Sequence, residues 1–271
     1  MCPWQPRADK YGGLPFLAWI MRKPKPFGKE DKTGCSEQGV MQRLQIQEGK
    51  YPMRTKENKD LPGSSRSNAS CTIRLIKDTC TACQTVIGDA FFGSVLVAVF
   101  LMVNYGIACI MNVKNCSKGY PKTWADAKLK GCSSGSYVVL AATITAKKIS
   151  DGTEVAVKLL AVSYRYARSK KVQHFICTSG NVTLGRPYLA KFKDAFSNTV
   201  CRPVNRPDVI AIFYWLANQI DLINQHRQDT LGHLKKWITH CAWTRLFAYN
   251  IGTVVVNGFK MYSTLSTSQQ Q

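Results

Sequence analysis

The sequence is short of acidic residues. It carries 16 Asp and Glu against 37 Lys and Arg, which gives a formal net charge of +21 and a pI of about 9.7. A surface this positive attracts polyanions and disfavours basic partners. Nucleic acid is therefore the expected partner, and an aspartate in an apolar setting becomes a candidate functional group because carboxylates are scarce.

A secretory signal is also lacking, because residues 1–10 are polar and carry Arg7 and Lys10. The 11 cysteines lie at irregular intervals, which is typical of a reducing compartment rather than of a disulfide framework. We expect nuclear or cytosolic residence. With 271 residues, 45% of them hydrophobic, the chain can bury one large core or two modest ones. We expect one domain with an insertion.

No charged residue occurs from residue 90 to residue 113, and this run exceeds the roughly 20 apolar residues that cross a bilayer. A turn signal at residues 104–106 interrupts it. We therefore predict a helix over residues 92–103 and a buried strand over residues 107–113. A membrane span at 90–113 stays open as the alternative, because a helix that is apolar on every face fits either a deep core or lipid.

Elsewhere, alternation at period two or short apolar runs predict strands, and apolar residues that recur at three and four predict helices. Residues 48–70 are charged and Ser-rich, which predicts a loop or a disordered excursion. Asp151-Gly152 predicts a hairpin between two strands. The expected strands are 40–47, 85–89, 137–146, 154–164 and 174–178; the expected helices are one that starts at 206–208 and one at 237–259, followed by a disordered Ser/Gln tail.

Two aspartates are candidates to share one metal site. Asp89 closes a buried strand, and catalytic groups in open sheets tend to lie at such ends. Asp221 lies on an apolar helix. On the residues alone, Asp89 can equally cap the helix that begins near Phe91. An acid on the apolar side of a helix costs several kcal/mol unless it is paired, so Asp221 would need a partner such as His226 or Arg227.

Two further groups of potential metal ligands are weak. Cys80 and Cys83 form half of a zinc site, and the sequence has no second Cys-x-x-Cys. His226, His233 and His240 recur every seven residues, but the residues between them do not favour one continuous helix. We expect structural or incidental roles for both groups.

The order of seven short segments resembles the catalytic domain of PiggyBac-type transposases and of the cellular proteins derived from them. The resemblance covers roughly residues 1–262 and implies an α/β, RNase H-like fold, a mixed sheet flanked by helices with a β-rich insertion. The segments are residues 4–7, 12–15, 22–28, 44–50, 88–94, 204–207 and 220–221. The implied division is 1–130 for the first part of the core with an incomplete first strand, 131–180 for the insertion, 181–262 for the helical end of the core and 263–271 for a disordered tail.

The resemblance also implies a site for two Mg²⁺ ions about 3.5 to 4 Å apart, which cleave and transfer DNA strands. Asp89 matches the family's second catalytic Asp and Asp221 the third, while Asn224 replaces a further family Asp. The family's first catalytic Asp would precede Met1. Because two carboxylates offset the mutual repulsion of two dications poorly, we expect Mg²⁺ binding to be weak or absent and both aspartates to be vestigial ligands.

The expected function is that of a degenerate, inactive transposase domain that resides in the nucleus and binds DNA non-specifically. One alternative is an active Mg²⁺-dependent transposase or nuclease, if the true N-terminus extends upstream; another is the membrane-anchored protein described above. The expected partner is DNA, with a homodimer as a further candidate and no small-molecule substrate. Basic residues are expected to contact phosphates, with a merely solvated face as the alternative. They are Arg22, Lys23, Lys25, Lys147, Lys148, Arg168, Lys170 and Lys171.

Overall fold

A computed structural model describes residues 2–3, 13–21, 27–61, 66–114, 117–166, 172–230, 239 and 241–268. The chain forms two compact units. Unit 1 comprises residues 1–57, 74–79 and 218–271, and unit 2 comprises residues 58–73 and 80–217. The helices are α1 (Lys50–Thr55), α2 (Arg66–Ile76), α3 (Val95–Tyr105), α4 (Lys122–Leu129), α5 (Asp208–Gln225) and α7 (Ala242–Ser268), and a π-helical turn, η2 (His226–Thr230), follows α5.

Unit 2 is built on a five-stranded mixed sheet of order β6-β7-β10-β9-β8. Its strands are β6 (Thr85–Gly88), β7 (Ala108–Asn112), β8 (Tyr137–Lys147), β9 (Glu154–Arg165) and β10 (Val172–Cys177). β6 and β7 run parallel, and the other neighbours run antiparallel. The predicted α/β class, a mixed sheet flanked by helices, is confirmed. The strands of residues 131–180 share this sheet with β6 and β7, and the predicted domain boundaries stay a prediction.

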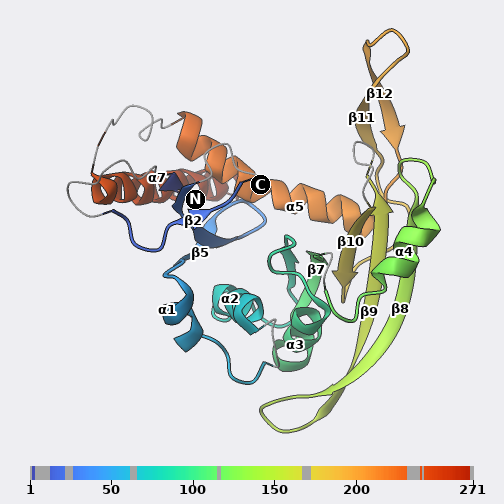
Figure 1. The fold of residues 1–271 in the computed structure, drawn as a ribbon, viewed down its shortest axis with the longest axis horizontal. Coiled ribbons are helices and arrows are strands. Elements are labelled where there is room, and N and C mark those ends of the chain that lie inside the picture. Colours follow the sequence, from blue (N-terminus) through green and yellow to red (C-terminus); the bar gives the residue numbers. More distant parts are fainter. Residues whose placement is uncertain are drawn as a thin grey trace. The chain divides into compact units, whose positions relative to one another are not determined.

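Both faces of this sheet are covered, and Figure 1 shows α4 and the first part of α5 on opposite sides of β9 and β10. Successive side chains of a strand point to opposite faces. Phe175 packs against Phe213 of α5 at a centroid distance of 4.9 Å, whereas its neighbour His174 packs against Tyr120, which precedes α4. A sheet buried on both sides explains why its central strands read as continuous apolar runs.

The uncharged run of residues 90–113 folds as a helix and a strand, as predicted. The hydroxyl of Ser94 caps α3 by accepting a hydrogen bond from the N–H of Val97 at 3.1 Å. Gly106 ends the helix in the left-handed conformation, with φ of 63°, which suits a residue without a Cβ. Among the helices that the structure describes, none is both long and apolar enough to cross a membrane.

Unit 1 contains a three-stranded sheet of order β1-β3-β2, a hairpin of β4 and β5, and helix α7. The side-chain amide of Asn257 on α7 accepts a hydrogen bond from the N–H of Met41 at 2.6 Å and donates one to its carbonyl at 3.0 Å. These two hydrogen bonds hold α7 to the start of β5. The strands are β1 (Cys2–Pro3), β2 (Ala18–Trp19), β3 (Phe27–Lys29), β4 (Asp31–Cys35) and β5 (Met41–Ile46).

Two predictions of irregular structure are wrong, and one hairpin was not predicted. Residues 48–70 contain α1 and the start of α2, where two buried apolar side chains, Met53 and Leu61, provide the anchoring that the polar composition hides. The polar stretch after β10 contains a hairpin of β11 (Tyr188–Lys193) and β12 (Thr199–Val204). The Ser-rich tail continues α7 to Ser268, and the hydroxyl of Ser263 donates to the carbonyl of Phe259 one turn back.

Candidate functional site

Asp89 lies at the carboxyl end of β6, as predicted, and its side chain is exposed. Its Oδ1 accepts a hydrogen bond from the backbone N–H of Phe91 at 2.8 Å. The alternative that Asp89 caps α3 is wrong, because Ser94 fills that position. The carboxylate instead orders the tight turn between β6 and α3.

Asp221 is also exposed, so the expectation that it lies on the apolar side of α5 and needs a buried partner is wrong. The inward face consists of Ile220, Ile223, Asn224 and Arg227, which follow the spacing i, i+3, i+4 and i+7. Asp221 is turned about 100° away from Ile220 around the helix. Asp89 belongs to unit 2 and Asp221 to unit 1, and a metal site shared by the two stays a prediction.

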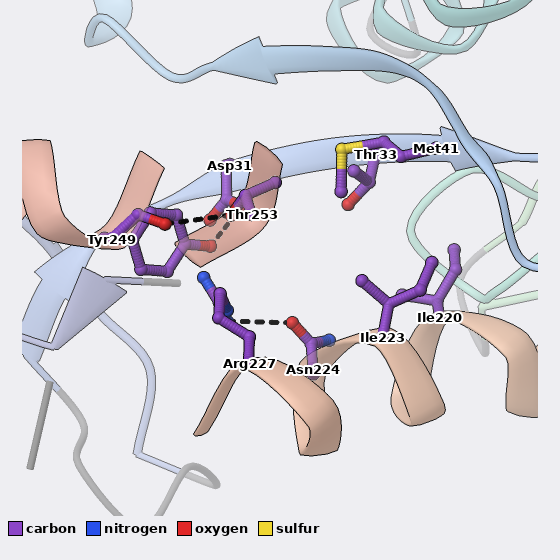
Figure 2. A pocket seen from close by; sticks show the side chains of 9 residues that line it. All are labelled: Asp31, Thr33, Met41, Ile220, Ile223, Asn224, Arg227, Tyr249 and Thr253. Carbon is purple, nitrogen blue, oxygen red and sulfur yellow. Dashed lines mark hydrogen bonds between the residues drawn. The ribbon is translucent and has the colours of Figure 1, made fainter. Parts of the chain in front are cut away.

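Asn224 lines a small pocket inside unit 1, drawn in Figure 2. The pocket has room for about one water molecule. The end of α5, the turn η2, the hairpin of β4 and β5, and α7 supply its walls. The lining residues are Asp31, Thr33, Met41, Ile220, Ile223, Asn224, Arg227, Tyr249 and Thr253.

A buried guanidinium is the main charge in this pocket. Arg227 is only 3% exposed, and its Nη2 donates a hydrogen bond to Oδ1 of Asn224 at 2.9 Å. The guanidinium carbon lies 3.7 Å from the ring centroid of Tyr249, a cation–π contact. Within the described residues, Nε and Nη1 of Arg227 have no hydrogen-bond partner.

Tyr249 links this cation to a carboxylate. Its hydroxyl donates a hydrogen bond to Oδ2 of Asp31 at 2.5 Å (Figure 2). Burial, and then the negative charge of Asp31, raise the pKa of Tyr249 above its usual value, although Arg227 opposes this. The phenol therefore stays protonated and acts as a donor. Inside unit 1, the ring of Tyr249 thus contacts the guanidinium of Arg227, and its hydroxyl contacts the carboxylate of Asp31.

The surroundings of Asn224 do not fit a divalent cation. At the position that the resemblance gives to a metal-binding Asp, the amide oxygen of Asn224 already accepts from a guanidinium. A fixed positive charge at this distance repels a dication, and Asn supplies no negative charge to compensate. In the described parts of the chain, no group of three or more His, Cys, Asp or Glu side chains could hold a metal ion.

A second polar cluster, in unit 2, contains the three residue types of a nucleophilic triad. The hydroxyl of Ser163 lies 2.9 Å from Nδ1 of His174, and Nε2 of His174 lies 3.2 Å from Oδ1 of Asp126. The hydroxyl of Tyr120 lies 3.0 Å from that of Ser163. Ser163 is only 1% exposed, so its hydroxyl is closed to substrates. Burial lowers the pKa of His174, and the contact between His174 and Asp126 fastens α4 to the sheet.

Two of the predicted phosphate-contacting lysines lie next to acids. Nζ of Lys147 is 4.0 Å from Oε1 of Glu154, and Nζ of Lys148 is 3.7 Å from Oδ2 of Asp151. These acids offset part of the positive charge at the β8–β9 turn, which weakens its attraction for phosphate. The other predicted contacts fall outside the described residues; they are Arg22, Lys23, Lys25, Arg168, Lys170 and Lys171.

The weak metal-ligand groups can be placed only in part. Cys83 is exposed, has a φ of 68°, and donates its N–H to the carbonyl of Gly106 at 3.0 Å. Its backbone N–H thus helps to order the turn before β6. His226 lies in η2, whereas His233 and His240 fall outside the described residues.

The fold has a solved counterpart. The chain is similar to the piggyBac transposase in a cryo-EM structure of its synaptic complex with hairpin DNA, with a TM-score of 0.65 and 17% sequence identity. The fold is piggyBac-like and RNase H-like. The match covers 96% of this chain and 46% of the transposase, so the chain spans about half the length of that protein. No family model and no curated protein matches the sequence.

Sequence reasoning named Asn224 but missed most of what surrounds it. Arg227 entered only as a partner for Asp221, whereas it contacts Asn224. Tyr249 and Thr253 carried a usable signal, because their i, i+4 spacing puts them on one face of α7. Asp31 carried none, since one acid at the start of a polar strand is usually solvated.

Proposed function

We propose that the chain is a degenerate piggyBac-like DNA transposase domain that binds DNA non-specifically in the nucleus and does not cleave it. The similarity to a transposase whose structure contains hairpin DNA supports this proposal, and so does the net charge of +21. Positive charge of this size supplies a sequence-independent affinity for phosphate backbones. Mg²⁺ would have been the metal of an active ancestor.

The observation that carries the loss of catalysis is the contact between Asn224 and Arg227. Two-metal cleavage of a phosphodiester needs carboxylates that hold both cations while charge develops on the attacking and leaving oxygens. A neutral amide that is hydrogen bonded to a guanidinium at 2.9 Å offers neither the charge nor the space. Asp89 and Asp221 would then persist as exposed acids with local roles, such as the turn that Asp89 orders.

Two measurements on the purified chain test this proposal. Binding to a labelled duplex should fall steeply between about 50 and 200 mM salt, because each phosphate contact releases a counterion. Supercoiled plasmid should stay intact in Mg²⁺ and in Mn²⁺. The matched control is Asp89→Ala, which should equal the parent chain in both assays. Nicking by the parent chain that Asp89→Ala abolishes would show an active nuclease, and an affinity that ignores salt would exclude backbone-driven DNA binding.

A further inference from the structure

The hairpin of β11 and β12, called here the ribbon (residues 188–204), projects beyond the five-stranded sheet of unit 2 (Figure 1). Its base is fixed by aromatic contacts. The ring of Tyr188 stacks on Tyr166 with centroids 5.6 Å apart and an interplanar angle of 4°. The guanidinium of Arg206 covers the same ring at 5.4 Å. The ribbon therefore leaves the domain at a defined angle.

An aromatic side chain is exposed to solvent at the tip of the ribbon. Phe196 is 86% exposed, the largest such fraction among the exposed large hydrophobic side chains of the described residues. The turn that carries it is ordered: Oδ1 of Asp194 accepts the N–H of Phe196 at 2.9 Å and that of Asn198 at 2.8 Å. Ser197 takes the left-handed conformation, with φ of 64°. An aromatic ring on a rigid turn is prepared for contact with a partner.

The ribbon carries three cations, Lys191, Lys193 and Arg202, and one acid, Asp194. Lys191 and Arg202 make no ion pair with any described residue, and Nζ of Lys193 donates to the carbonyl of Ser197 at 2.8 Å. Lys191 and Lys193 lie on one face because side chains alternate along a strand. Arg202 pairs with Ala190 across the hairpin and lies on the other face. At the β8–β9 turn, by contrast, Lys147 and Lys148 each face an acid.

We propose that the ribbon binds duplex DNA, with Lys191, Lys193 and Arg202 on phosphates and Phe196 wedged between base pairs. This proposal rests on the proposed DNA-binding function and names the element responsible. A two-stranded ribbon fits a DNA groove, and an apolar side chain that unstacks one base step is a common way to hold a bent duplex. Charge on both faces suits a groove, which has a phosphate strand on each side.

The test compares the ribbon with the β8–β9 turn in the full chain. Phe196→Ala should weaken duplex binding about fivefold or more and abolish the fluorescence rise of 2-aminopurine that reports base unstacking. The double variant Lys191→Ala/Arg202→Ala should lower the slope of log affinity against log salt by about two. The matched controls are Ile149→Ala, an exposed apolar residue at the other turn, and Lys147→Ala/Lys148→Ala; each should change affinity and slope much less.

The outcomes separate the two proposals. If the parent chain binds duplex DNA and the ribbon variants behave like their controls, the ribbon is not the contact, while the proposed function stands. If the parent chain binds no duplex, both proposals fail. If the parent chain binds duplex DNA without a rise in 2-aminopurine fluorescence, Phe196 does not insert between base pairs. Because Phe196, Lys191 and Arg202 are exposed, the variants should keep the far-UV circular dichroism spectrum and unfolding midpoint of the parent chain.

Discussion

Removing parts of Tyr249 should measure how firmly the buried cation of unit 1 is held. Tyr249→Phe deletes the hydroxyl that donates to Asp31 at 2.5 Å and keeps the ring under Arg227. Loss of one hydrogen bond to a charged group lowers the free energy of unfolding by about 1.5–3 kcal/mol. Tyr249→Leu deletes the ring as well, and a desolvated cation–π contact contributes about 2 kcal/mol more.

A double-mutant cycle isolates the second contribution. Arg227→Met removes the charge and keeps the length of the side chain. Combined with Tyr249→Leu, it should give a coupling free energy of about 2 kcal/mol, because both changes remove the same contact. Combined with Tyr249→Phe, it should give a clearly smaller coupling free energy. Tyr249→Phe keeps the ring, so only Arg227→Met removes the ring–guanidinium contact in that cycle.

Urea unfolding of the parent chain and of each variant supplies the free energies. The transition should be followed by fluorescence and by circular dichroism, whose midpoints must coincide for the cycle to be valid. Equal coupling for the Phe and Leu variants, or coupling below about 0.5 kcal/mol for the Leu variant, would refute the stacking of Arg227 on Tyr249 as a stabilising contact.

Two further predictions concern unit 2, with one control on α7. An ideal Cβ on Gly93 would lie 1.8 Å from the carbonyl oxygen of Asn112, so Gly93→Ala should lower the free energy of unfolding by about 4 kcal/mol or more, whereas Gly258→Ala, with open space around it, should raise it by up to about 1 kcal/mol. Burial lowers the pKa of His174, so the unfolded chain binds the proton more readily than the folded chain. The stability of the folded chain should therefore be full above about pH 6.5 and fall as the pH drops below it. In urea unfolding midpoints measured against pH, His174→Gln should weaken this pH dependence.

Local signals were sufficient for the core of unit 2. The run after Asp89 could be resolved into helix and strand because Gly106 allows the left-handed turn that ends α3. Asp151 and Gly152 fixed the β8–β9 hairpin in the same way, since few residues adopt that turn. The fold class followed from these elements together with the resemblance.

Elements whose apolar residues are few were missed. The ribbon contains only Ala190 and Val204 as buried apolar residues. Apolar and basic residues alternate over residues 190–193, but the exposed Leu189 interrupts the pattern, and four residues are too few to predict the hairpin. Helix α7 extends through Ser263 to Ser268, although the Ser-rich composition there predicts disorder. Tertiary packing, rather than propensity, decides such segments.

The inward-facing residues of α5 could also be predicted from the sequence only in part. Asp221 was assigned to the apolar side of α5 because it stands between apolar residues in sequence, yet a period of 3.6 residues places Asn224 and Arg227 inward and Asp221 outward. What the period could not show is that the charge buried there is positive. An arginine is rarely buried, and it is tolerated here because Tyr249 and Asn224 surround it. The guanidinium of Arg227 thus lies where the resemblance implies a ligand for a metal cation. Replacing Asn224 alone would leave that guanidinium in place.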